Sequence, residues 1–231
     1  MVLEDSLRPT GFLDYESPPV RRFVEQALPR DGLSAVEKAT RLYYAVRDTI
    51  LYEIYGADLS RTGLQASAII AAGSGLCIHK SIVYAAAVRS VGIPSRLVLT
   101  DVRNHLTSDR LRRFVGGDVF HYHCLVSVFI EGRWVKATPV FNKKLCQLYR
   151  MKPLDFDGTQ DSLHHPYDDN GHKFMEFIRV HGDFDDFPYD SVIEGLRKAH
   201  PNLFGTRDRF RTGSLVAEAV AAARAEDCAY P

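Results

Sequence analysis

Apolar residues recur at helical spacing in the first part of the chain. Residues 18–28 and 34–48 both show apolar positions three and four apart, which predicts two amphipathic helices. Ser34 and Glu37 form an S-x-x-E capping box at the start of the second helix. Both helices are expected to serve as scaffold.

Two further helices are predicted on either side of a short glycine-rich segment. Residues 67–72 predict a short helix that ends at Gly73-Ser74-Gly75, and residues 77–91 predict a long one that ends at Gly92-Ile93-Pro94. The long segment is rich in alanine and valine, with polar residues scattered around it. That composition favours a central, buried helix.

After Pro94 the pattern changes to β-strands. Residues 95–100, 120–130 and 133–140 are β-branched or apolar runs, and Glu131-Gly132 forms a turn between the last two. The order is helices followed by an antiparallel sheet, which predicts an α+β fold with helices packed on the sheet.

The rest of the chain is harder to assign. Residues 143–188 contain turn signals, among them His181-Gly182-Asp183, and no clear element. Helices are predicted again at residues 190–200 and 214–225, which would form a C-terminal helical extension. No internal repeat or interdomain linker is visible, so one domain is expected over residues 1–231.

Charge and composition exclude several classes of partner. The 231 residues include 29 basic and 29 acidic ones, so no net field would draw the protein to nucleic acid or to an anionic membrane. No apolar stretch is long enough to span a bilayer, and the polar start of the chain lacks the apolar run of a signal peptide. A cytoplasmic protein is expected. The sequence does not predict the oligomeric state.

The four cysteines show no paired spacing and are expected to be reduced thiols. Cys77 is singled out because it begins the predicted alanine-rich helix, in the segment Gly75-Leu76-Cys77. Unpaired N–H groups and the positive end of the helix dipole would favour a thiolate there and could bind an oxyanion. A glycine turn before it would let substrate approach the sulfur. The alternative is a small buried cysteine in a helix cap.

His123 is the candidate base for this nucleophile. It lies near the start of the apolar strand at residues 120–130, from which an imidazole could reach a helix terminus. A two-residue turn at Glu131-Gly132 pairs residues whose numbers sum to 263, which places Leu125 opposite Thr138. His123 and Thr138 are then diagonal neighbours on one face, with Cβ atoms roughly 7 Å apart.

Together these residues resemble a known family. Gly75-x-Cys77, the stretch Arg89-Ser90-Val91-Gly92-Ile93-Pro94-Ser95-Arg96, His123 and Gly132-Arg133-Trp134-Val135 resemble the transglutaminase-like superfamily, of the bacterial type, over about residues 35–142. The resemblance implies a papain-like core, a Cys-His-Asp triad and acyl-transfer chemistry on amides. Residues 143–231 would be an extension to this core.

The chain departs from the family at the third member of the triad. Thr138 stands in Trp134-Val135-Lys136-Ala137-Thr138-Pro139, where the family usually has an aspartate. A hydroxyl can orient the imidazole but cannot neutralise an imidazolium. Asn142, on the same face, could orient it instead, as could an acid from outside the core such as Asp157 or Asp161.

Other candidate sites are less specific. Nine histidines suggest a metal, but no zinc or calcium ligand spacing is present, so neither a metal nor a cofactor is expected. Arg103 and Asn104 follow the first strand and could bind substrate or stabilise a loop. The basic run at residues 110–113 lacks interleaved aromatic residues, so no nucleic-acid partner is expected.

The sequence therefore predicts a cysteine enzyme in which Cys77 forms a thioester with an amide or peptide acyl group. His123 would act as general base and then as general acid. Hydrolysis and acyl transfer to an amine both remain open, on a protein, peptide or small amide substrate. The rival hypothesis is a non-catalytic binding module, suggested by Thr138 at the acid position.

Overall fold

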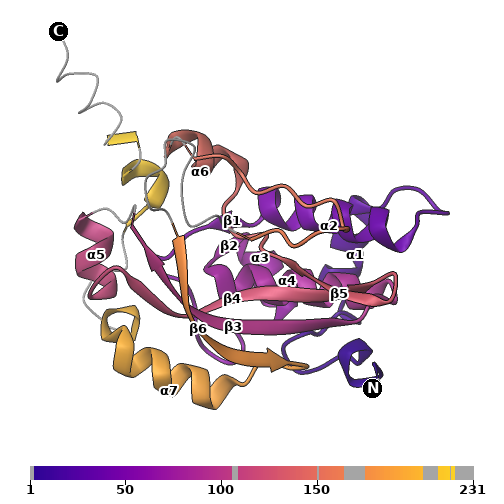
Figure 1. The fold of residues 1–231 in the computed structure, drawn as a ribbon, viewed down its shortest axis with the longest axis horizontal. Coiled ribbons are helices and arrows are strands. Elements are labelled where there is room, and N and C mark those ends of the chain that lie inside the picture. Colours follow the sequence, from indigo (N-terminus) through magenta and orange to yellow (C-terminus); the bar gives the residue numbers. More distant parts are fainter. Residues whose placement is uncertain are drawn as a thin grey trace, which may run out of the picture.

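A computed structural model describes residues 3–105, 109–149, 151–163, 175–204, 213–218 and 220–221 of the chain (Figure 1). Its α-helices are α1 (Pro18–Ala27), α2 (Ala35–Thr49), α3 (Ala66–Ala72), α4 (Cys77–Ser90), α5 (Asp109–Val115), α6 (Lys143–Leu148) and α7 (Tyr189–Ala199). The 3₁₀ helices are η1 (Asp5–Leu7) and η2 (Pro201–Phe204). Its strands are β1 (Leu51–Tyr52), β2 (Ser74–Gly75), β3 (Ser95–Asn104), β4 (Val119–Ile130), β5 (Arg133–Ala137) and β6 (Met175–Phe184).

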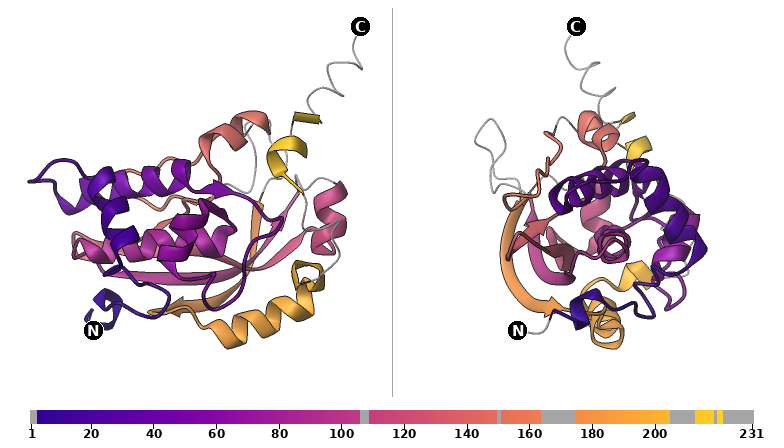
Figure 2. Two further views of the ribbon diagram at one scale, coloured as in Figure 1. Left: turned by 180° about the vertical axis from the view of Figure 1, so that it is seen from behind. Right: turned by 90° about the vertical axis from the view of Figure 1, so that its right-hand side faces the viewer.

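Four strands form one antiparallel sheet in the order β5-β4-β3-β6. The short strands β1 and β2 pair in parallel as a separate ribbon. Helices α1 to α4 lie on one side of the sheet, and α4 runs between the sheet and the other three (Figure 2). The predicted α+β class is confirmed.

The β4–β5 hairpin has the predicted register. Ile130 pairs with Arg133 and Val126 with Ala137, so the paired numbers sum to 263. The two turn residues have positive φ, 50° at Glu131 and 81° at Gly132, as a type I′ turn requires. The pairing ends earlier than expected, at Ala137, which pairs with Val126 and also forms a parallel bridge with Ser162.

The predicted helices are found within one or two residues of their expected bounds, and the capping box of α2 is formed. The helices α5 and α6, the strand β6, the short strands β1 and β2 and the two 3₁₀ helices were not predicted. The turn signal at residues 181–183 was wrong, because these residues lie inside β6, where a register shift near Gly182 accommodates the glycine. Of the helix expected at residues 214–225, residues 215–218, 220 and 221 are helical, Ser214 is not, and residues 219 and 222–225 fall outside the described residues.

Helix α4 is buried on every side, as its composition predicted. Near its end the Arg89 guanidinium donates hydrogen bonds to the Ser95 hydroxyl and carbonyl and to the carbonyls of Arg8 and Asp185, at 2.6 to 3.1 Å. One buried cation thus joins α4 to β3, to the N-terminal segment and to the chain after β6. This explains physically why the last turn of α4 carries an arginine.

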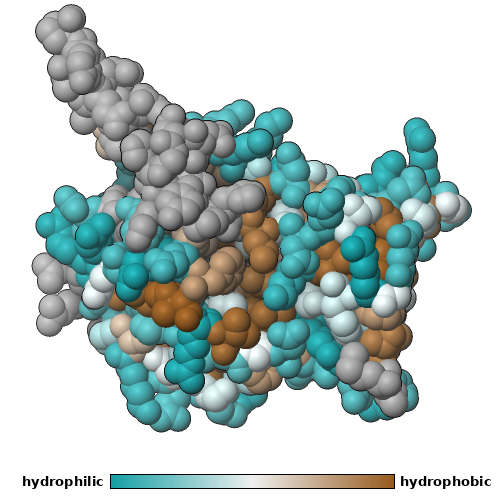
Figure 3. Space-filling model, in the orientation of Figure 1, coloured by the Kyte–Doolittle hydropathy of each residue, from teal (hydrophilic) through white to brown (hydrophobic). Residues whose placement is uncertain are grey.

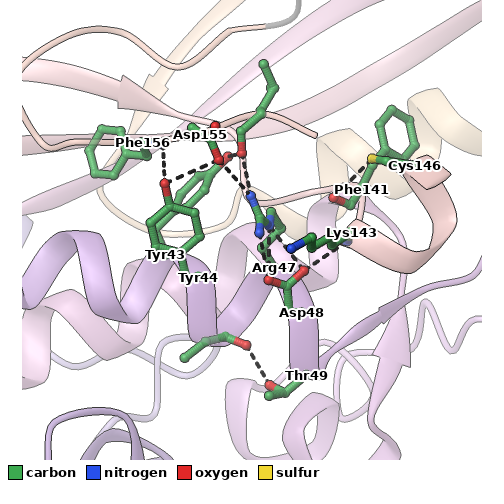
Figure 4. A network of polar contacts seen from close by, with 12 residues as sticks. Tyr43, Tyr44, Arg47, Asp48, Thr49, Phe141, Lys143, Cys146, Asp155 and Phe156 are labelled. Atoms are coloured by element: carbon green, nitrogen blue, oxygen red, sulfur yellow. Dashed lines mark hydrogen bonds and ion pairs between the residues drawn. The ribbon is translucent and has the colours of Figure 1, made fainter. Parts of the chain in front are cut away.

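The segment that follows β5 is attached to α2 by polar contacts (Figure 4). Arg47 donates to the Leu154 carbonyl at 2.8 Å and forms an ion pair with Asp48 at 2.7 Å. Asp48 in turn accepts the backbone N–H of Lys143 at 2.9 Å, at the start of α6. These contacts fix α6 beside the N-terminal helices.

Apolar side chains gather at the centre of the face shown in Figure 3. Ile178 and Val180, on the edge strand β6, are 47% and 63% exposed.

Among the described helices, none combines the length and apolar character that crossing a membrane requires.

Candidate active site

Cys77 is the first residue of α4 and lies at the end of the β1–β2 ribbon. Gly75, two residues before it, pairs with Tyr52 in β1. Cys77 is partly exposed, whereas Cys124 and Cys146 are buried, and all three are free thiols. Cys228 lies outside the described residues. Cys77 is therefore the accessible thiol of the part of the chain that the structure describes.

The glycine before Cys77 makes room for a histidine side chain, a role that the sequence did not predict. A Cβ at Gly75 would lie 2.6 Å from the Cβ of His79, so the glycine makes room for this side chain. His79 is buried, its Nδ1 accepts the Leu76 N–H at 3.3 Å, and its Nε2 lies 3.0 Å from the Asp58 carbonyl oxygen. His79 thus fixes the start of α4.

The sulfur of Cys77 lies against strand β4, beside the residue that follows His123. Burial raises the pKa of the Cys77 thiol to about 11, and the backbone N–H groups of Cys124, Ile78 and Cys77 oppose this shift. The N–H groups at the helix start therefore lower the thiol pKa as expected, but burial raises it by more. The resting thiol is protonated at neutral pH, contrary to the thiolate that the helix terminus alone predicted.

His123 is 5% exposed and pairs with Thr100 of β3. Burial lowers the pKa of the imidazole to about 4, so it is neutral at rest. Its Nε2 is enclosed and has no hydrogen-bond partner among the described residues. The imidazole thus has an unsatisfied nitrogen, as expected of a group that exchanges a proton with a substrate or nucleophile.

A β-bulge precedes His123. The β3–β4 register shifts between Thr100 and Val102, and Tyr122 has a positive φ of 56°. The Tyr122 N–H donates to the Asp101 carboxylate at 3.1 Å rather than to a strand carbonyl. Bulges are frequent next to active sites because they redirect a side chain. Here the bulge sets the direction in which His123 leaves the strand.

Two more histidines hold the carboxylate that supports this bulge. His181 Nε2 lies 2.7 Å from Asp101 Oδ1, and His121 Nδ1 lies 3.2 Å from Oδ2. The ring of Tyr122 stacks on His181 with centroids 4.5 Å apart. Sequence reasoning missed this cluster. An aspartate inside an apolar strand was the available signal, but its partners depend on the pairing of β6 with β3.

Thr138 follows the last residue of β5 and is 1% exposed. The strand pairing ends at Ala137, opposite Val126, so the expected diagonal position of Thr138 relative to His123 stays a prediction. Its Oγ1 has no hydrogen-bond partner among the described residues, and the same is true of His123 Nε2, so the two are not hydrogen-bonded to each other. The backbone is fixed, because the Thr138 carbonyl accepts the Tyr43 hydroxyl at 3.1 Å.

The alternative orienting groups are engaged elsewhere. Asn142 is buried at the start of α6, and its Oδ1 accepts the Tyr52 N–H at 3.2 Å. The exposed Asp157 accepts two N–H groups of its own loop, which lower its pKa, and Asp161 accepts the Lys136 N–H at 2.8 Å. None of the three forms a hydrogen bond with His123 in the described structure.

Of the two predicted substrate-binding residues, one lines a pocket with His123 and the other does not. Asn104 lines a pocket that also contains His123 and Tyr52. The Arg103 guanidinium lies instead 3.7 Å from Asp118 and 3.5 Å from Glu176. Tyr52 was not predicted to belong to the site. The pKa of its phenol is raised well above its ordinary value, first by burial and then by the neighbouring Cys77.

No group of three or more His, Cys, Asp or Glu side chains within the described ranges is arranged to hold a metal ion. His164 and His165, considered as ligands in the sequence, fall outside those ranges.

Comparison with known proteins gives a family and two similar structures. Residues 22–139 match the transglutaminase-like superfamily. A candidate cysteine protease from Cytophaga hutchinsonii is 15% identical, with a TM-score of 0.45; the match covers 81% of this chain and 48% of that one, so the chain spans about half its length. Arylamine N-acetyltransferase from Salmonella typhimurium is 17% identical, with a TM-score of 0.46 and coverage of 89% and 74%. No curated protein shows significant sequence similarity.

Proposed function

From the premise that this chain belongs to the transglutaminase-like superfamily, we propose that it is a cysteine enzyme acting on amide or peptide acyl groups through a thioester on Cys77. One observation carries the proposal: Cys77 begins α4 close enough to β4 for the N–H of Cys124, the residue after His123, to lower the pKa of its thiol. This proximity supports a nucleophile and a base that come from two different elements and meet at one edge of β4.

The reaction begins with both groups neutral. As the sulfur attacks the acyl carbon, the thiol proton passes to His123, a C–S bond forms and the carbonyl oxygen becomes an oxyanion. The backbone N–H of Cys77, at the open start of α4, stabilises that oxyanion. The C–N bond then breaks, and the leaving amine takes the proton from His123, which leaves a thioester.

The second half returns the enzyme to its starting state. Water or a second amine attacks the thioester carbonyl and gives a proton to His123. The C–S bond breaks, and the sulfur recovers that proton from the imidazolium. The enzyme is a hydrolase when water is the acceptor and a transferase when an amine is.

Thr138 is the proposed orienting group for His123. Thr138 Oγ1 and His123 Nε2 are both enclosed and without a hydrogen-bond partner among the described residues, and Thr138 directly follows the end of β5, which pairs with β4. Each unsatisfied buried group costs about 1–3 kcal/mol, so a small shift that joined them would be favourable. A hydroxyl acceptor would fix the tautomer without adding negative charge.

The test is to trap the acyl-enzyme. The protein is incubated with a library of peptide amides and activated esters, and intact-protein mass spectrometry detects an acyl adduct. Cys77→Ala should abolish the adduct, and His123→Ala should slow its formation by about a hundredfold or more. Cys146→Ser is the matched control and should keep it. An adduct that persists in Cys77→Ala, or forms equally fast in His123→Ala, would refute the proposal.

The second candidate function is a binding module that keeps the cleft without catalysis. Thr138 in the position of the family's acid favours it. Iodoacetamide separates the two functions: a binding module predicts labelling of Cys77 that follows simple thiol ionisation and is insensitive to His123→Ala.

A further inference from the structure

A pocket beside His123 has a wall of almost purely apolar side chains. Twelve residues line it, and ten of these carry hydrocarbon, aromatic or thioether side chains. The polar groups of the lining belong to His123, Asn104 and the hydroxyls of Tyr52 and Tyr149, and no Asp, Glu, Lys or Arg is among the twelve. Its empty volume is about 630 Å³, including space open to solvent. Small-molecule sites share this mostly apolar character, with a few polar groups in the wall.

The pocket adjoins the reacting groups on two sides. His123 forms part of one wall, and Tyr52 forms part of another. Tyr52 is held next to the nucleophile because it pairs with Gly75, two residues before Cys77. Its ring also packs edge-to-face on Phe141, with centroids 4.8 Å apart. Cys77 does not itself line the pocket, so a bound group would lie beside His123 and near the start of α4.

Much of the wall comes from outside the part of the chain that matches the family. Leu145, Tyr149, Met151, Met175 and Leu215 all follow residue 139, where that match ends.

Hydrogen bonds hold the most distant of these residues in place. The Leu215 N–H donates to Glu53 Oε2 at 3.0 Å, and its carbonyl accepts the Tyr149 hydroxyl at 3.4 Å. Met151 is fixed by a bond from its N–H to the Cys146 carbonyl at 2.8 Å. The wall is thus built by specific contacts.

We propose that this pocket binds an uncharged, apolar side group of the acyl donor, such as a benzyl or branched alkyl group, and presents the adjoining carbonyl to Cys77. The inference rests on the proposed function and names its substrate class. A charged group would lose its hydration in this wall without gaining an ion-pair partner. An aromatic or branched alkyl group gains by burial against rings and thioethers.

Three alkylating reagents with one reactive group test the proposal. N-methyl, N-benzyl and N-(4-carboxybenzyl) chloroacetamide all form a C–S bond with Cys77 and release chloride. Rates from intact mass are divided by each reagent's rate with glutathione. The N-benzyl reagent should label Cys77 about tenfold faster than the N-methyl one, and the carboxylate should remove that advantage. Equal normalised rates for all three would overturn the pocket proposal.

Variants connect the preference to the pocket. Met151→Asp places a charge in the wall and should reduce the ratio of benzyl to methyl labelling to near one. Met151→Ala should lower it in part and serves if the aspartate variant does not fold. Ile178→Asp, on the exposed part of β6, is the matched control and should keep the ratio. If Met151→Ala leaves the ratio of benzyl to methyl labelling unchanged, the benzyl group does not bind in this pocket.

A binding measurement separates this proposal from the proposed function. N-benzylacetamide cannot react, so its binding to Cys77→Ala protein is followed by saturation-transfer NMR. Binding through the phenyl ring that Met151→Ala weakens supports the pocket even if no acyl-enzyme is found. Formation of the acyl-enzyme without ring binding would leave the function standing and overturn the pocket.

Discussion

Replacing Lys80 by methionine should change how the protein's stability depends on pH. Lys80 lies one turn after Cys77 in α4 and is 0% exposed. Its Nζ donates to the carbonyls of Arg47, at 2.8 Å, and Ile50 at the end of α2. Burial lowers the pKa of this ammonium from 10.5 to about 7, although Asp48 opposes the shift.

The sign follows from proton counting. Between pH 7 and 10.5 the unfolded chain keeps a proton on Lys80 that the folded chain has lost, so the free energy of unfolding rises with pH. The slope approaches about 1.4 kcal/mol per pH unit well above the folded pKa, which gives a gain of roughly 1.5 kcal/mol between pH 7 and 8.5. Lys80→Met should not show this gain. The variant also leaves the carbonyls of Arg47 and Ile50 without the lysine donor, and this cost is the same at every pH.

Urea denaturation of both proteins at several pH values between 6 and 8.5 measures the effect. Other titrating groups are common to both, so the difference in their unfolding free energies isolates Lys80. That difference should shift in favour of the wild type as pH rises. Lys144→Met removes an exposed lysine of α6 and should show no such shift. A constant difference between wild type and Lys80→Met would refute the reasoning, because it would mean that the buried lysine stays charged throughout.

Three further substitutions test other parts of the structure. Arg89→Met leaves buried oxygen acceptors without their cation and should lower the unfolding free energy by about 3 kcal/mol or more in urea; a loss under about 1 kcal/mol would contradict the assignment. For Asp101, burial raises the pKa but hydrogen bonds, the strongest from His181, lower it overall, so its stabilisation is present near neutral pH and lost in acid. Thermal unfolding should therefore show Asp101→Asn less stable than wild type at pH 7 and nearly equal at pH 3, and a gap of equal size at both would refute this. Gly75→Ala should cost about 1–3 kcal/mol through its clash with His79, and adding His79→Ala should restore part of that loss if the clash is the cause.

The sequence predicted those features that depend on neighbouring residues. The helices followed from periodicity and caps, and the β4–β5 register followed from one two-residue turn at Glu131 and Gly132. The family resemblance also followed from linked local motifs. In each case the physical cause lies within a few residues, so a single sequence contains it.

Features made by distant segments were not predicted. Strand β6 contains Gly182 and polar residues, and it becomes a strand because β3 offers an open edge. The raised pKa of Cys77 comes from burial beneath surrounding elements, which outweighs the helix start that the sequence shows. The apolar pocket likewise combines side chains from segments far apart in the chain, such as Tyr52 and Leu215.

The position of β6 in the chain bears on how the protein is made. Thr100 pairs with Val180, so the partner of β3 leaves the ribosome 80 residues after β3 does. Until then one side of β3 exposes free backbone groups, which is the kind of edge that promotes association between nascent chains. We therefore expect chains truncated before residue 175 to need chaperones during synthesis more than the full-length chain does.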